Sequence, residues 1–149
     1  MILFLDASII IWRAEGLPAF QRAAHEAVDE LSKLHAAPAL AVSRLSWLEC
    51  RVKPLREGDP ALLASYARFF SGGVQIVELG AEVVDHATQL RAKFGLKTPD
   101  ALQAASALRL PGPLIFLTGD AGFSRVKGLQ VRVIKPLTQA RMRARRSTI

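Results

Sequence analysis

Two short runs of apolar residues each lead to an aspartate. One is Ile2-Leu3-Phe4-Leu5, which runs into Asp6, and the other is Leu114-Ile115-Phe116-Leu117, which runs through Thr118-Gly119 into Asp120. An uninterrupted apolar run is typical of a strand covered on both faces, as in a parallel sheet between helices. Ligand sites of open α/β sheets lie beyond the carboxyl ends of the strands. We therefore predict that the two aspartates share one rim of the sheet.

Strands and helices alternate along the rest of the chain. Short apolar runs between turn residues predict strands over residues 2–5, 39–42, 74–77, 114–117 and 131–134. Apolar positions at three- and four-residue spacing predict helices over residues 18–35, 44–52, 60–70, 81–94 and 99–110, with a helical turn near 122–126. Ser43 and Asp59 are expected N-caps, and Pro54 is expected to stop the second helix. This order predicts a three-layer α/β/α domain whose sheet is mainly parallel, with about five strands.

Size and composition favour one cytoplasmic domain. The chain has 149 residues, of which 50% are hydrophobic, and its longest apolar stretches fall far short of the roughly 20 residues that cross a bilayer. No basic region precedes the first apolar run, so we expect neither a signal peptide nor a membrane segment. The single cysteine, Cys50, excludes an internal disulfide and fits a reducing cytosol.

The positive charge is concentrated near the C-terminus. The chain carries a net charge of +7, and residues 121–149 contain lysines and arginines but no acidic residue. We divide the chain into a domain, residues 1–136, and a basic tail, residues 137–149. A basic flank beside an acidic pocket suits a nucleic acid partner. The alternative is a solvated tail that aids solubility.

A third acid, Glu49, falls among the apolar positions of a predicted helix. Leu45, Leu48, Glu49 and Val52 follow one another at i, i+3, i+4 and i+7, so we predict that the carboxylate lies on the side facing the core. The structural alternative is a flanking position whose carboxylate reaches water.

A fourth acid, Asp100, lies in the first turn of a predicted helix, on the face of Ala104 and Leu108. Acids in a first turn also complement the helix dipole, which is the structural alternative here. For Asp6 and Asp120 the alternative is an aspartate that caps a turn after a strand.

Together these acids indicate a site for a divalent cation and a phosphate. Two carboxylates about 4 Å apart repel by roughly 4 kcal/mol at an effective dielectric constant near 20, so a cluster needs raised pKa values or a bound cation. Oxygen ligands select Mg²⁺ or Mn²⁺. The scattered histidines and single cysteine lack the spacing of a zinc site.

Four motifs occur in a recognisable order. They are Leu5-Asp6-Ala7-Ser8, Ser46-Trp47-Leu48-Glu49, Thr98-Pro99-Asp100-Ala101, and Leu117-Thr118-Gly119-Asp120 followed by Phe123. Their order and surroundings resemble those of the PIN-domain ribonucleases, in particular the toxins of bacterial VapBC toxin–antitoxin pairs. The resemblance extends from Ile2 to about Pro136.

The resemblance implies a metal-dependent endoribonuclease that cleaves RNA by a metal-activated water and leaves a 5′-phosphate and a 3′-hydroxyl. It also implies a set of four acids that hold Mg²⁺ or Mn²⁺, namely Asp6, Glu49, Asp100 and Asp120. Asp6 is the expected central ligand, since it ends the middle strand of such a sheet. Ser8 and Thr118 are expected to orient the carboxylates or the metal-bound waters, and the alternative is that they only cap turns.

One position departs from the family pattern. Many relatives carry a further acid just before the phenylalanine of the last motif, where this chain has Gly122. A complete second metal site is therefore open to question: substrate phosphate could complete it, or one metal could suffice.

The resemblance further implies a homodimer and a small antitoxin that holds the toxin inactive. The segment Ile9-Ile10-Ile11-Trp12, with Leu17 and Phe20, is more apolar than one buried face of a short helix requires. We expect it to contribute to the dimer or antitoxin surface, with core packing as the alternative. For Trp47, stacking on a base and burial in the core are the two interpretations.

Other functions fit the residues less well. A housekeeping RNA-processing PIN nuclease without an antitoxin and a non-catalytic RNA-binding or scaffold protein of PIN fold are the main alternatives. A phosphoacceptor receiver domain needs an acidic pair after the first strand, whereas Asp6 stands alone. A phosphatase of the haloacid dehalogenase type needs a second aspartate that Asp6-Ala7-Ser8 lacks.

Overall fold

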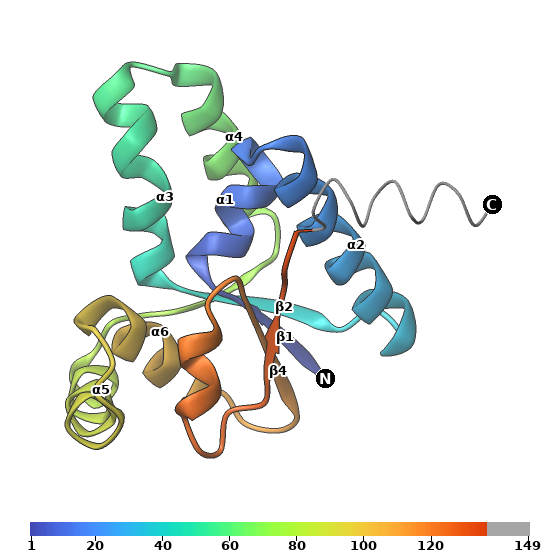
Figure 1. The fold of residues 1–149 in the computed structure, drawn as a ribbon. Coiled ribbons are helices and arrows are strands. Elements are labelled where there is room, and N and C mark those ends of the chain that lie inside the picture. The colour runs from blue at the N-terminus through green and yellow to red at the C-terminus, as the bar shows by residue number, and fades with distance from the viewer. Residues whose placement is uncertain (137–149) are drawn as a thin grey trace.

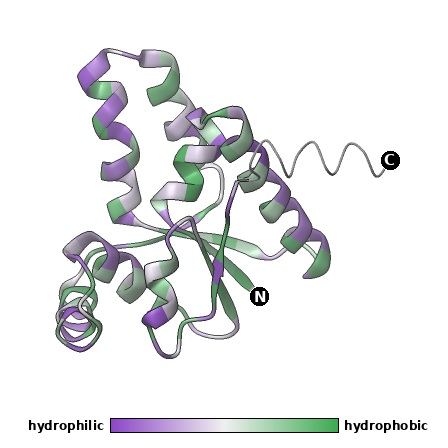
Figure 2. Cartoon of the chain, viewed as in Figure 1, coloured by the Kyte–Doolittle hydropathy of each residue, from purple (hydrophilic) through white to green (hydrophobic). Residues whose placement is uncertain are grey.

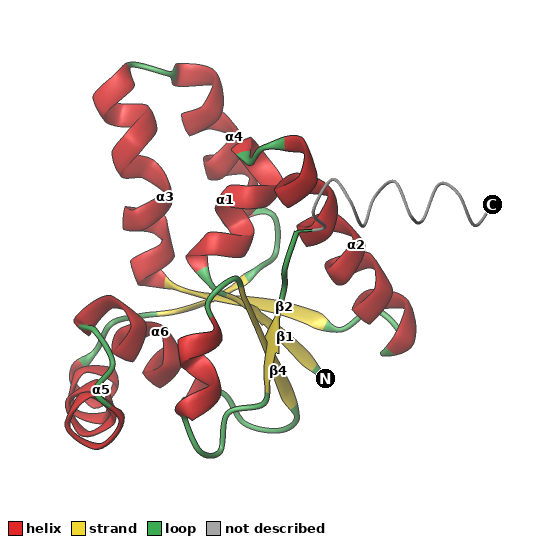
Figure 3. Cartoon of the chain, in the orientation of Figure 1, coloured by secondary structure: helices red, strands yellow, loops and turns green. Residues whose placement is uncertain are grey.

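A parallel five-stranded sheet forms the middle of the molecule (Figures 1 and 3). Its strands lie in the order β3-β2-β1-β4-β5. They are β1 (Ile2–Leu5), β2 (Ala39–Ser43), β3 (Gln75–Val77), β4 (Leu114–Thr118) and β5 (Val131–Val133). The computed structural model describes residues 1–136, so the predicted basic tail lies outside the described residues. All five predicted strands are confirmed to within one residue at each end.

The sheet register brings the two predicted aspartates to one rim. β1 is the middle strand, and it pairs with β4 so that Leu5 lies opposite Leu117. The backbone N–H of Asp6 donates to the Leu117 carbonyl at 2.9 Å, which extends the ladder by one step. The turns that follow β1 and β4 therefore leave the sheet side by side, as the two apolar runs predict.

Helices cover both faces of the sheet, which confirms the three-layer architecture. On one face lie α1 (Ala7–Glu15), α2 (Pro18–Leu34), α3 (Arg44–Glu57) and α4 (Pro60–Ser71). On the other lie α5 (Ala81–Phe94), α6 (Thr98–Leu108) and the short 3₁₀ helix η1 (Ala121–Arg125). Leu3 and Leu5 pack into the first layer and Phe4 into the second. The central strands are accordingly apolar along their length (Figure 2), because each face of a strand meets a separate core.

Helix α3 departs from the prediction in length and in orientation. It continues through Pro54 to Glu57, so the expectation that Pro54 ends it is wrong. Its buried side consists of Ser46, Cys50 and Pro54, whereas Leu48 is 58% exposed. The helix rises beyond the sheet beside α1 and α4 (Figure 1). Only a narrow side of the helix is therefore covered. Of the stripe predicted to face the core, Leu48 and Val52 are exposed, whereas Leu45 and Glu49 are half-buried.

The apolar segment after Asp6 forms α1, whose bounds the pattern alone did not give. Ile9 and Ile10 are buried in the core, and Ile11 and Trp12 pack against it. The ring of Trp12 meets Phe20 of α2 edge-on, with centroids 4.8 Å apart. Core packing is thus the correct interpretation for Ile9 and Ile10, and their expected role in a contact surface is wrong.

The described residues contain no helix with the length and apolarity that a membrane crossing demands.

Replacing Phe116 with alanine should destabilise the fold strongly. Its ring is fully buried and lies 5.4 Å from the ring of Phe4 and 4.7 Å from that of Phe123, so it joins β1, β4 and η1. We expect Phe116→Ala to lower the free energy of unfolding by about 3–5 kcal/mol in chemical denaturation. Leu34→Ala, at a position that is 70% exposed, is the control, with an expected change within about 0.5 kcal/mol. Equal effects of both changes would contradict this account of the core.

Candidate active site

Asp6 is a buried carboxylate at the junction of β1 and α1. It caps the helix, and its Oδ1 accepts the N–H of Ala7 at 2.8 Å. Its Oδ2 accepts two hydroxyls, from Ser8 at 2.9 Å and from Thr118 at 2.8 Å. Burial raises the pKa of Asp6 and the charge of Asp100 adds to the increase, while the three hydrogen bonds oppose it. The side chain is only 8% exposed, so its position is fixed.

Ser8 and Thr118 join the two turns at the rim. Besides donating to Asp6, the Ser8 hydroxyl accepts the backbone N–H of Gly119 at 3.1 Å, and the Thr118 hydroxyl accepts that of Asp120 at 3.0 Å. Each hydroxyl therefore serves as donor and acceptor, and the turn after β4 is held against the start of α1. A residue that only caps a turn needs one hydrogen bond to the backbone, whereas each of these hydroxyls also donates to the Asp6 carboxylate.

A steric contact explains why residue 119 is glycine. A Cβ atom built at this position would overlap the six-membered ring of Trp12. The indole of α1 thus packs directly on the backbone between Thr118 and Asp120. The turn is consequently held by an apolar contact as well as by the hydroxyls.

Asp120 is exposed and begins η1. Its Oδ1 accepts the N–H of Gly122 at 2.8 Å, which is the capping contact that the structural alternative predicted. The contact occupies one carboxylate oxygen and leaves Oδ2 free of hydrogen bonds to the described residues.

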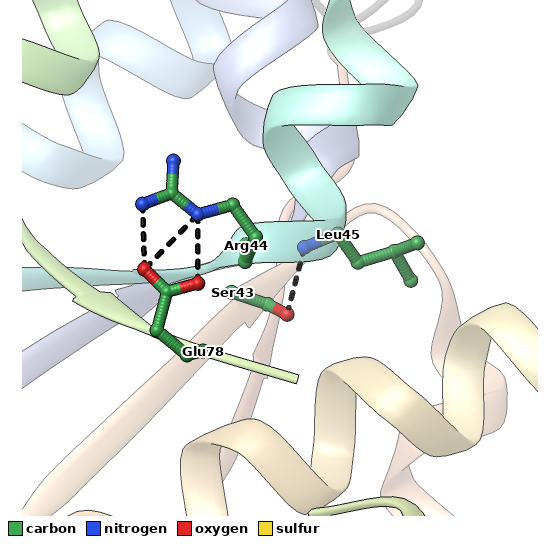
Figure 4. Close-up of polar contacts among 4 residues, drawn as sticks. All are labelled: Ser43, Arg44, Leu45 and Glu78. Atoms are coloured by element: carbon green, nitrogen blue, oxygen red, sulfur yellow. Dashed lines mark hydrogen bonds and ion pairs between the residues drawn. The ribbon is translucent and has the colours of Figure 1, made fainter. Parts of the chain in front are cut away.

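Contacts at the β2–α3 junction position Glu49. The hydroxyl of Ser43 caps α3 by accepting the N–H of Leu45 at 3.2 Å, as predicted. Next to it, Arg44 forms a forked ion pair with Glu78 after β3, with Nη2 2.6 Å from Oε1 and Nε 2.9 Å from Oε2 (Figure 4). This pair lowers the pKa of Glu78. The first turn of α3 is thereby fixed to two strands, and Glu49 follows one turn later.

The charges of Asp6 and Asp100 act on Glu49. Partial burial is the largest cause that raises the pKa of this carboxyl to about 7, and the two charges add to the increase. A hydrogen bond from Gln103 acts in the opposite direction. The sequence predicted Glu49 on a stripe that faces the core. The structure covers that stripe only in part, since Leu48 and Val52 are exposed, but Glu49 itself is half-buried.

Asp100 completes the group from α6. It lies in the first turn of that helix and is partly buried. Burial raises its pKa and the charge of Asp120 adds to the increase, whereas the positive charges of Lys97 and Arg125 lower it. Two of the four acids, Asp6 and Asp120, cap α1 and η1, and the other two lie in α3 and α6. Their charges act on one another.

A buried polar network beneath the acids escaped the sequence argument. Gln103 of α6 donates to the hydroxyl of Ser46 at 2.9 Å, and Ser106 donates to the hydroxyl of Ser43 at 2.9 Å. Within residues 1–136, Oε1 of Gln103 is buried with no hydrogen-bond partner. One feature of the sequence could have pointed to this role of Gln103. The residue lies three positions after Asp100, on the same helix face, within an alanine-rich run.

Trp47 and Cys50 are packing residues in this structure. The indole of Trp47 meets Phe70 edge-on at 5.1 Å, and the guanidinium of Arg51 lies over it at 4.0 Å. This favours the core interpretation of Trp47 over base stacking. Cys50 is buried, and burial raises the pKa of its thiol far above the usual range, so a nucleophilic role has no support.

The donor set fits a hard cation that keeps much of its water. All four acids supply oxygen, and burial together with mutual repulsion raises the pKa of Asp6, Glu49 and Asp100. Across residues 1–136, no three His, Cys, Asp or Glu side chains form a group that could hold a metal ion by themselves. Mg²⁺ commonly binds through one or two carboxylates, with waters and substrate phosphates as the other ligands.

Comparison with known families identifies the domain. The PIN domain model matches residues 3–129. The chain belongs to the PIN domain family. No protein of curated function matches the chain. The PIN domain thus covers both aspartate-ending strands and all four acids.

Solved structures share this PIN fold at low sequence identity. A chain of VapBC2 from Rickettsia felis, bound to a promoter DNA fragment, is 17% identical with a TM-score of 0.70, over 91% of this chain and 100% of that one. A toxin–antitoxin complex from Klebsiella pneumoniae is 22% identical with a TM-score of 0.66, over 91% and 99%. VapBC-1 from Haemophilus influenzae is 19% identical with a TM-score of 0.67, over 89% and 98%. At such identities the similarity establishes the fold.

The raised pKa of Glu49 predicts a specific pH dependence of stability. The pKa of Glu49 in the folded state is near 7, above the ordinary 4.5. The contribution of the protonated carboxyl to the free energy of unfolding is therefore fully present below pH 4.5 and is lost as pH rises through 7. In metal-free buffer, Glu49→Gln should leave Tm unchanged near pH 4.5 and raise it by about 2–4 °C near pH 8, once solvent screening of the half-exposed carboxylate is allowed for. Glu57→Gln, at an exposed position of the same helix, is the control. A Glu49→Gln curve parallel to that of the wild type would refute the raised pKa.

Proposed function

We propose that this PIN domain is a metal-dependent endoribonuclease and the toxin of a bacterial VapBC-type toxin–antitoxin pair. Two observations support the proposal: Asp6 and Asp120 follow neighbouring parallel strands at the carboxyl rim of the sheet, and the pKa values of Asp6, Glu49 and Asp100 are raised by burial and by the charges of nearby acids. Membership of the PIN family and a fold shared with chains of VapBC complexes support it. The cytosol is the proposed compartment, in keeping with one buried free thiol.

Each acid has a proposed task that follows from its environment. Three hydrogen bonds fix Asp6, which would be the central metal ligand. Asp100, Asp120 and Glu49 would hold the cation or its waters. Bound Mg²⁺ or Mn²⁺ supplies a water of lowered pKa and stabilises negative charge on the scissile phosphate. Ser8 and Thr118 hold the Asp6 carboxylate in one orientation.

The pKa of Glu49 links metal binding to pH. Near neutral pH this carboxyl is about half protonated, and a cation binds only its ionised form. Metal binding therefore releases a proton, and the affinity for Mn²⁺ should increase as pH rises through about 7.

The proposed protein partners are an antitoxin and a second copy of the chain. The antitoxin is proposed because the similar folds occur in VapBC complexes. For the second copy, the outward side of α3 supplies an apolar surface formed by Leu48, Val52 and Leu55, which are 58%, 46% and 58% exposed. Exposed apolar patches of this kind mark contact sites.

Two other functions make different predictions. An RNA-processing PIN nuclease would cleave RNA without a cognate antitoxin, and a small reading frame for a DNA-binding protein next to its gene would argue against it. A non-catalytic RNA-binding scaffold would show no cleavage with any metal. The presence of all four acids favours catalysis over that scaffold.

Asp6→Asn and Asp100→Asn should abolish cleavage of cellular RNA in the presence of Mg²⁺ or Mn²⁺. Each change removes one negative charge from the site while keeping the side-chain shape, and we expect a loss of at least about 10²-fold. The measurement is electrophoresis of total RNA after incubation with each metal or with EDTA. Asp85→Asn, at an exposed position of α5, is the matched control.

Thermal melting must first show that the variants fold. Cleavage by the wild type that EDTA stops and that both variants lose supports the proposal. Undiminished cleavage by both variants would remove the acids from the catalytic centre. Folded wild-type protein free of any copurified partner, with no cleavage in either metal, would favour the scaffold.

Leu48→Asp combined with Val52→Asp should separate the proposed homodimer. The two carboxylates would be buried without partners in an apolar contact, which costs several kcal/mol. We expect light scattering coupled to size-exclusion chromatography to give the mass of one chain for the variant and of two for the wild type. Val84→Asp, on the exposed side of α5, is the control. A monomeric wild type would refute this surface as a dimer contact.

A further inference from the structure

The acid cluster needs more positive charge than one divalent cation brings. Even when Glu49 is protonated, the other three acids carry three negative charges in their ionised forms, and one Mg²⁺ or Mn²⁺ cancels two of them. A phosphodiester approaching this rim adds another negative charge. In a partly buried site the repulsion is weakly screened by salt, so cationic side chains beside the acids are needed if an RNA backbone is to bind there.

Arg125 is the cation that the structure fixes at this place. It ends η1, five residues after Asp120, and its Nε donates to the carbonyl of Gly122 at 3.2 Å. A Cβ atom at Gly122 would lie 3.1 Å from Oδ1 of Asp120 and 3.7 Å from Nη2 of Arg125. The guanidinium and the Asp120 carboxylate thus border the same small space, which a glycine keeps open.

The guanidinium is open to a ligand from solvent. The side chain is exposed, and among residues 1–136 it has no carboxylate within ion-pair distance. It therefore combines a tethered Nε with terminal nitrogens that can meet a ligand from solvent.

Lys97 provides an informative comparison. It directly precedes α6, three residues before Asp100. Its ammonium forms no hydrogen bond with the described residues, so nothing fixes its direction. A planar guanidinium anchored at one nitrogen presents a fork that matches phosphate oxygens, whereas a lysine acts as a mobile point charge.

We propose that Arg125 binds a backbone phosphate of the RNA at the acid site and acts there as a second positive centre beside a single divalent cation. Glycine at position 122 leaves the guanidinium of Arg125 free for this contact. A carboxylate at position 122 would pair with the guanidinium and draw it away from the substrate. The inference rests on the proposed nuclease function and specifies how that site receives its substrate.

The competing explanation is structural: Arg125 only closes η1 through its bond to the Gly122 carbonyl. That role would affect folding stability. It would leave the dependence of RNA binding on salt unchanged, since no phosphate contact would be lost.

The test compares Arg125→Met and Arg125→Lys with Arg56→Met, a control at an exposed position near the far end of α3. Binding is measured in the cleavage-deficient Asp6→Asn background, with a short fluorescent single-stranded RNA of mixed sequence over a range of salt concentrations. Cleavage is measured in the native background with saturating Mn²⁺. Binding of Mn²⁺ without RNA is followed by electron paramagnetic resonance.

We expect Arg125→Met to reduce the slope of log affinity against log salt by about 0.7, the value for one phosphate contact on a single strand. Cleavage should fall about 10²-fold, while one Mn²⁺ per chain still binds. Arg125→Lys should restore the salt slope and only part of the rate. Arg56→Met should match the wild type. An unchanged salt slope and rate in Arg125→Met would overturn the proposal.

A second pair of variants tests the role of Gly122. Gly122→Asp should reproduce the losses of Arg125→Met, because the new carboxylate pairs with the guanidinium. Gly122→Ala adds the Cβ without charge and should retain the salt slope. Faster cleavage by Gly122→Asp, with a second Mn²⁺ bound, would overturn the proposal in favour of a second metal.

Failure of this inference can be told from failure of the nuclease proposal. If the wild type does not cleave RNA in any metal, the nuclease proposal fails, and Arg125 is then judged by the salt slope alone. If the wild type cleaves and the Arg125 variants match it in rate and slope, only the present inference fails.

Discussion

The hydrogen bonds that Ser8 and Thr118 donate to the buried Asp6 carboxylate are the constraint on which the rest of the site depends. They link the helix that follows the middle strand to the turn that follows its neighbour, across 112 residues of sequence. Two parallel strands in register would bring their ends together in any case. The hydroxyls do more, since they fix the orientation of a charged group that burial alone would tend to neutralise.

The site is electrostatically unfavourable, and the fold around it supplies the compensation. Three of its carboxyls have raised pKa values because they are desolvated close to other acids. The adjoining layers are fully packed, with Phe4 and Phe116 stacked on one face of the sheet and Ile9 buried on the other. A packed sheet of this kind keeps the carboxylates close together although they repel one another. A cation that binds between them relieves this repulsion, which favours its binding.

Much of this molecule could be predicted from its sequence, for reasons that lie in particular residues. The runs before Asp6 and Asp120 are apolar at every position because each strand touches two cores, and that pattern fixes both the strands and the rim. The orientation of α3 could not be predicted in this way. Helical periodicity tells which residues share a face, but whether Leu48 or Cys50 is covered depends on where the helix leaves the sheet.

Contacts between distant polar residues were equally hidden. The pairing of Gln103 with Ser46 joins two helices, and neither residue stands out until α6 has packed beside α3.

The packing of Trp12 on Gly119 has a consequence for how this sequence can diverge. The indole occupies the space of any side chain at position 119, so the two positions are not independent. A lineage that gains a side chain at 119 must first exchange the tryptophan for something smaller, and one that loses the tryptophan is released from glycine. The path between two functional sequences therefore passes through a fixed order of changes, set by one steric contact.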